Sequence, residues 1–97
     1  MTNAEIAFVF NDIAELLKLK KDNIFKIRAY QKVARSINEL QEPLEKIVTE
    51  NRLGEVPGAG EAIRKKMTEL VTTGKLAYYE KLKEESPANT LSQTGAK

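Results

Sequence analysis

The sequence predicts an all-α protein, a compact bundle of four to five short helices. Apolar residues recur at helical spacing in several segments, and capping or helix-stopping residues fall between these segments. No segment alternates apolar and polar residues as a half-buried strand does. The chain has 97 residues, which is enough for one small domain with a modest core.

The first two helices are indicated by their caps and their apolar stripes. Thr2 and Glu5 have the spacing of a capping box. The apolar stripe that follows predicts a first helix from about Asn3 to Leu19. A second helix is expected from about Ile24 to Glu39, after a short basic loop. Its expected inner face comprises Ile24, Ile27, Ala34 and Ile37, with Tyr30 and Val33 alongside.

Three shorter helices are expected in the rest of the domain. Pro43 suits the first turn of a third helix, ending near Asn51, because a proline there leaves no N–H without a partner. An apolar stripe over residues 61–73 predicts a fourth helix, and Gly74 suits the position that ends it. A last short helix is expected over residues 75–85.

Composition excludes several classes of protein. The chain has no cysteine and no histidine, so it lacks disulfides, thiolate zinc sites and the commonest general base. No apolar run approaches the roughly 20 residues that cross a bilayer. We expect a cytoplasmic protein, nucleoid-associated if prokaryotic, without a membrane partner. Residues 1–85 are expected to form the domain, and residues 86–97 a disordered tail, because they show no periodicity.

Charge is distributed unevenly along the chain. The net charge is +2, but residues 18–35 carry seven cations and one aspartate, a local charge of +6. Residues 1–17 and 36–50 each carry −3. A basic block of this kind is typical either of a solvated helix face or of a surface that binds nucleic acid, and charge alone does not distinguish the two.

The segment EVPGAGEAIRKKMTELVTT, residues 55–73, contains the strongest motif. Two close glycines permit a tight turn whose N–H groups no Cβ covers, and the helix that follows adds the positive end of its dipole. This is the form of a helix-hairpin-helix, although a plain turn between helices also favours glycine. We expect phosphate binding without sequence specificity, by Gly58, Ala59, Gly60, Arg64 and Lys65.

One catalytic chemistry remains open to these residues, namely amine catalysis by Lys66. A neutral lysine attacks an aldehyde carbon, forms a Schiff base and promotes β-elimination, if desolvation or nearby cations lower its pKa. Lys66 lies at the margin of the apolar stripe of its helix. The alternative is a lysine that lays its stem on the core and keeps its ammonium in water. The chain has only two aspartates, so an acidic magnesium site is not expected.

Three segments together are similar to a known family: NAEIAFVFNDIAELL, NIFKIRAYQKVARSI and EVPGAGEAIRKKMTELVTTGKLAYYEKL. Over about residues 3–85 they resemble the N-terminal eight-kilodalton domain of family X DNA polymerases, the group that includes DNA polymerase beta and PolX. The resemblance implies a helical bundle with one helix-hairpin-helix. It also implies binding of gapped or nicked DNA with a 5′-phosphate in base excision repair. A polymerase module in the native full-length chain would be a partner, whereas this chain contains no polymerase active site.

The resemblance also assigns residues. It places Lys66 on the nucleophile of the family's 5′-deoxyribose phosphate lyase, and Lys26 and Tyr30 in the pocket for the 5′-phosphate and the abasic sugar. No cofactor is required in that family, but a monovalent cation, Na⁺ or K⁺, is often held at the hairpin by backbone carbonyls. Those carbonyls would here belong to Gly54, Val56 and Ala59.

Three positions depart from the family pattern. Phe25 stands where the lyase-competent animal enzyme has a histidine, and Ala62 and Tyr79 stand where it has lysines. Arg28 and Lys65 are candidates to replace the missing charge. We therefore expect a DNA-binding domain first, with an active lyase as the alternative. A protein-interaction module is a third hypothesis, with Phe8, Tyr78 and Tyr79 as its contacts.

Overall fold

The computed structural model describes residues 1–85, and the predicted tail lies outside the described residues. Over this range the chain is all-α, as predicted, with no strand. A single turn of 3-10 helix, η1, precedes α4. The elements are α1 (Asn3–Leu19), α2 (Ile24–Asn38), α3 (Leu44–Thr49), η1 (Leu53–Glu55), α4 (Glu61–Thr73) and α5 (Ala77–Glu85).

Most helix ends fall where the caps predict them. α1 and α4 have the predicted bounds, and Thr2 and Glu5 form the predicted capping box. α2 ends one residue earlier than expected and α5 begins two residues later. Pro43 is the N-cap of α3 and not part of its first turn, and α3 ends at Thr49. Gly74 ends α4 in the left-handed conformation, with φ +79°.

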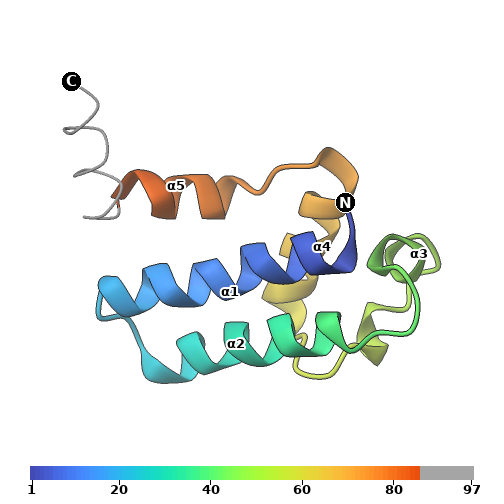
Figure 1. The fold of residues 1–97 in the computed structure, drawn as a ribbon, viewed down its shortest axis with the longest axis horizontal. Coiled ribbons are helices and arrows are strands. Elements are labelled where there is room, and N and C mark those ends of the chain that lie inside the picture. Colours follow the sequence, from blue (N-terminus) through green and yellow to red (C-terminus); the bar gives the residue numbers. More distant parts are fainter. Residues whose placement is uncertain (86–97) are drawn as a thin grey trace.

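The helices pack in pairs around one core. α1 lies along α2, and α5 lies on the other side of α1 (Figure 1). α4 crosses behind this layer, and α3 packs against α4 at the end of the molecule near the N-terminus (Figure 1). This arrangement brings the segment before α4 next to α2, although the two are far apart in the sequence.

A column of three aromatic rings leads from the core to the surface between α2 and α4. The ring centre of Phe10 lies 6.1 Å from that of Tyr30, and Tyr30 lies 6.2 Å from Tyr78. Phe10 is completely buried and Tyr30 is 3% exposed. Tyr78 is half-buried and forms the outer end of the column, so a rigid aromatic base lies beneath the adjacent surface.

One prediction about the inner face of α2 is wrong. Ile24 does not belong to the inner face of α2, because it is 49% exposed. The neighbouring residues Leu19 and Phe25 are also exposed, which shows that this end of α1 and α2 extends beyond the core. Tyr78 and Tyr79, the contacts named in the protein-interaction hypothesis, are partly buried and pack against the core of this domain.

Phe8 in α1, the third contact named in the protein-interaction hypothesis, is exposed. Phe8 lies off the apolar stripe and is 64% exposed.

No helix within residues 1–85 combines the length and the hydrophobicity that crossing a membrane requires.

Candidate nucleic-acid interface

The hairpin, residues 52–60, contains a tight turn that requires glycine. The Ala59 N–H donates to the Val56 carbonyl at 3.1 Å, and Gly58 has φ +84°. Proline followed by a residue with positive φ is the pattern of a type II turn, here Pro57 and Gly58. A Cβ at position 58 would also lie 3.1 Å from the aliphatic stem of Lys32. Both the conformation and the close approach therefore favour glycine.

One face of α2 holds the hairpin in place. The buried Ser36 donates its hydroxyl to the Pro57 carbonyl at 2.8 Å, and the Lys32 stem packs on Gly58. Lys32 and Ser36 are one helical turn apart and so share a face. Sequence reasoning did not single out Lys32. The i, i+4 spacing of Lys32, in the basic block, and Ser36, just after it, was the signal available for it.

The start of α4 offers backbone donors. No side chain caps Gly60, and the first hydrogen bond within the helix runs from the Arg64 N–H to the Gly60 carbonyl at 2.9 Å. The N–H groups of residues 61–63 therefore have no partner in their own helix. Together with the helix dipole, they favour an anion at this point.

A hollow of about 540 Å³ lies between α2, the hairpin, α4 and α5. We call it the lysine pocket. Five of the predicted site residues meet there, namely Lys26, Tyr30, Gly58, Gly60 and Lys66. The other residues that line it are Ala29, Glu61, Ala62, Ile63 and Tyr78.

The two lysines of the pocket share one aromatic ring. Lys66 Nζ lies 4.7 Å from the centre of the Tyr78 ring, and Lys26 Nζ lies 5.6 Å from it. Cations at such distances are attracted by the ring quadrupole. Tyr78 therefore holds two positive charges from different helices over one hollow, and it was not predicted as a pocket residue. Its place two residues after the TGKL ending of the motif gave no sign of this role.

The pocket charges are only lightly neutralised. Lys66 is half-buried, and within residues 1–85 no carboxylate lies within ion-pair distance of it. Lys26 lies 3.9 Å from Asp22, at the edge of that distance. Burial raises the pKa of Tyr30 above its usual range, and its protonated hydroxyl can donate a hydrogen bond.

Three predicted phosphate contacts lie outside the pocket. Arg28 is exposed on α2, two residues after Lys26, which turns it about 200° around the helix from that lysine. Lys65 is solvated, with its side chain 79% exposed and Nζ 3.8 Å from Glu61. Arg64 turns back onto the hairpin, where its Nε donates to the Ala59 carbonyl at 2.8 Å.

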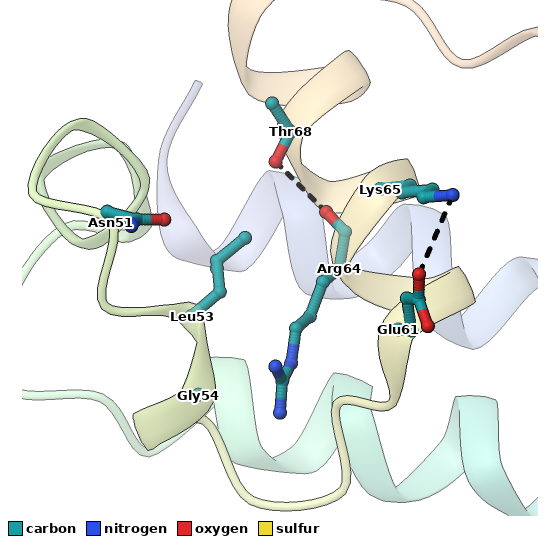
Figure 2. Close-up of a pocket in the computed structure, with 7 residues that line it drawn as sticks. All are labelled: Asn51, Leu53, Gly54, Glu61, Arg64, Lys65 and Thr68. Atoms are coloured by element: carbon teal, nitrogen blue, oxygen red, sulfur yellow. Dashed lines mark hydrogen bonds and ion pairs between the residues drawn. The ribbon is translucent and has the colours of Figure 1, made fainter.

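Two of the three carbonyls expected to hold a monovalent cation accept hydrogen bonds within the chain, one of them from a charged group. The Val56 carbonyl accepts the turn hydrogen bond, and the Ala59 carbonyl accepts from Arg64. Figure 2 shows the Arg64 side chain running from α4 down to the segment that contains Gly54. Nη2 of Arg64 reaches to 3.9 Å from where a Cβ of Gly54 would lie. The Ala59 carbonyl therefore has a cationic donor from within the chain.

A family model described as a helix-hairpin-helix domain matches residues 1–76. The chain belongs to this family. In the helix-hairpin-helix domain described above, the helices that flank the hairpin are α3 and α4, and the family indicates DNA binding without sequence specificity. No curated protein gives a significant match to the chain.

Proposed function

We propose that this helix-hairpin-helix domain binds gapped, nicked or 5′-phosphorylated DNA in DNA repair, as a domain of DNA polymerase X type. The observation that carries the proposal is the lysine pocket, in which Lys26 and Lys66 meet the hairpin glycines over one hollow. The implied partner protein is a polymerase module that acts on the same gap.

The pocket and the hairpin suit two different phosphates. A terminal phosphate carries more charge than a phosphodiester, and two lysines with little carboxylate pairing favour such a group. The hairpin amides and the start of α4 suit a backbone phosphate, because they offer N–H donors and the dipole end. A DNA end that places its 5′-phosphate in the pocket can place a neighbouring phosphate at the hairpin.

The test is the affinity for a one-nucleotide-gapped duplex with a 5′-phosphate or a 5′-hydroxyl, measured by fluorescence anisotropy over a salt series. We expect roughly tenfold tighter binding of the phosphate form, since charge-assisted hydrogen bonds to the end are added. Each phosphate neutralised steepens the log–log salt dependence by roughly 0.7–0.9. Lys65→Ala serves as a control, because Lys65 is solvated on the same helix as Lys66 and does not line the pocket. This variant should keep the preference for the 5′-phosphate. Equal affinity for both ends would refute end recognition.

We also propose, as a second function, that Lys66 makes the domain a 5′-deoxyribose phosphate lyase. The supporting observation is that Lys66 lines the pocket, half-buried, 4.7 Å from the Tyr78 ring and without a carboxylate partner within residues 1–85. Its amine would attack C1′ of the open-chain sugar, and the addition product would lose water to form a Schiff base. Loss of a C2′ proton would then break the C3′–O bond and release the 5′-phosphorylated DNA.

Borohydride reduction tests this second function, because it converts the Schiff base into a stable covalent adduct. We expect an adduct with an incised abasic site for the wild type and for Lys65→Ala, and none for Lys66→Ala. An adduct of equal yield in Lys66→Ala would show that another amine reacts.

A further inference from the structure

The guanidinium of Arg64 contacts the hairpin backbone and does not line the lysine pocket, although the residue is exposed. Its Nε donates to the Ala59 carbonyl at 2.8 Å, and its Nη2 approaches Gly54. A second hollow, of about 580 Å³, lies beside it between η1 and α4 and is lined by Gly54 and Arg64 among others (Figure 2). The side chain therefore bridges the beginning and the end of the hairpin.

We propose that Arg64 is a built-in cation of the hairpin, which takes the place of a bound alkali-metal ion. A charged donor on a backbone carbonyl makes a stronger hydrogen bond than a neutral one, and it fixes the direction of that carbonyl. It also lends positive charge to the turn whose N–H groups face phosphate. A metal ion at the same carbonyls would lie within a few ångströms of the guanidinium and would be repelled.

Arg64 is thus a positioning residue for the hairpin and not a direct phosphate contact. The local sequence permits this, because Arg64 is the first residue whose N–H bonds within α4 and lies one turn after Gly60. From there a long side chain can turn back along the helix towards its N-terminus, where the Ala59 carbonyl lies. Lys65, the next residue, points into solvent and cannot make this contact.

The test compares KCl, NaCl and tetramethylammonium chloride at equal ionic strength, because the last cation is too large for a carbonyl site. The first readout needs no DNA: the melting temperature, followed by circular dichroism. We expect the wild type to melt at the same temperature in all three salts. Arg64→Met keeps the aliphatic stem and removes the charge. In tetramethylammonium chloride it should melt about 5 °C below the wild type, and in KCl or NaCl it should regain part of this loss. Lys65→Met is the matched control and should show no dependence on the salt cation.

The second readout is affinity for gapped DNA in the same salts, and it rests on the proposed function. We expect Arg64→Met to bind about tenfold more weakly than the wild type in tetramethylammonium chloride and only about threefold more weakly in KCl. Taking the ratio to the wild type in each salt removes the effect of the cation on the DNA itself.

The outcomes separate the two proposals. A wild type whose melting temperature rises in KCl or NaCl holds a metal ion, and that overturns the role of Arg64 even if Arg64→Met does not fold. A folded Arg64→Met that no alkali cation rescues also overturns it. Absence of DNA binding by the wild type would refute the proposed function, while the melting temperatures would still decide the role of Arg64.

Discussion

Two groups of charged residues in this domain use their charges differently. Arg52 contacts three carboxylates, those of Glu42, Glu50 and Glu55, and we call this set the Arg52 cluster. Both terminal nitrogens of Arg52 donate hydrogen bonds to the Glu42 carboxylate, at 3.2 and 2.5 Å. The lysine pocket, in contrast, places two cations over one ring with a single carboxylate at 3.9 Å from one of them.

The difference separates charge that holds the fold from charge available to a ligand. In the Arg52 cluster the guanidinium is fully engaged by carboxylates of the domain, and the cluster fastens the start of α3 to the hairpin. In the lysine pocket Asp22 lies at the edge of ion-pair distance from Lys26 and no carboxylate within residues 1–85 pairs with Lys66, so an anion from outside can still bind there. In the sequence, the residues of the Arg52 cluster and of the lysine pocket are simply basic or acidic residues. Only their geometry in the structure distinguishes the two groups.

The largest effect is expected when the pocket loses both cations. Lys26→Ala with Lys66→Ala should weaken binding of 5′-phosphorylated gapped DNA by about 100-fold at low salt and flatten its salt dependence, because at least one phosphate loses its counter-charge. The melting temperature should change little, since neither ammonium is buried within the core. Anisotropy titrations and circular dichroism measure the two quantities. If the double variant loses stability but keeps its affinity for DNA, the two lysines hold the fold, as the Arg52 cluster does, and do not bind the ligand.

The next effect concerns the turn between the two regions. Gly58→Ala should lower the free energy of unfolding by about 1–2 kcal/mol, because alanine at φ +84° is strained and its Cβ meets the Lys32 stem. Gly60→Ala is the matched control, since Gly60 has φ −76° and a Cβ there would meet nothing within 4 Å. Urea denaturation gives both values. Equal losses at the two positions would contradict the assignment of the turn to Gly58.

The Arg52 cluster should make stability depend on acid pH. Hydrogen bonds from Arg52 hold the pKa of Glu42 and of Glu55 below the usual 4.5. Carboxyls with a depressed folded pKa stabilise fully above their unfolded pKa, and this contribution is lost as the pH falls through the folded value. The wild type should therefore lose stability below about pH 5 more steeply than Arg52→Met. Melting curves from pH 7 to pH 3 test this, and parallel profiles would show that Arg52 does not stabilise these carboxylates.

Much of the fold could be predicted from the sequence, because helix ends depend on local chemistry. The Thr2–Glu5 capping box and Gly74 fix their helix ends through neighbouring residues alone, and both predictions are confirmed. Ile24 shows the limit of this approach. Its periodic position places it on the inner face, but periodicity does not reveal how far the core extends along a helix, and Ile24 lies beyond it.

The lysine pocket was predicted only in part, for a related reason. Lys26 and Tyr30 were assigned through the family resemblance, and Lys66 both through that resemblance and from its place at the margin of the apolar stripe of its helix. Tyr78 and Lys32 join the site through packing between helices, which no local pattern encodes. The direction of Arg64 likewise depends on a carbonyl five residues earlier in the chain, so spacing alone could not separate a phosphate contact from a bond to the hairpin.

The smallest effects are expected at the two adjacent tyrosines of α5, which face different regions. The Tyr79 hydroxyl donates to Asp12 on α1 at 2.6 Å, whereas the buried Tyr78 hydroxyl has no hydrogen-bond partner within residues 1–85. Tyr79→Phe should lower the free energy of unfolding by about 1 kcal/mol, because Asp12 loses a bond to its carboxylate. Tyr78→Phe should change it by less than about 0.5 kcal/mol and should leave DNA affinity unchanged, because the ring beneath Lys66 is retained. Urea denaturation of both variants makes the comparison, and an equal loss in Tyr78→Phe would mean that the pocket tyrosine has a polar partner after all.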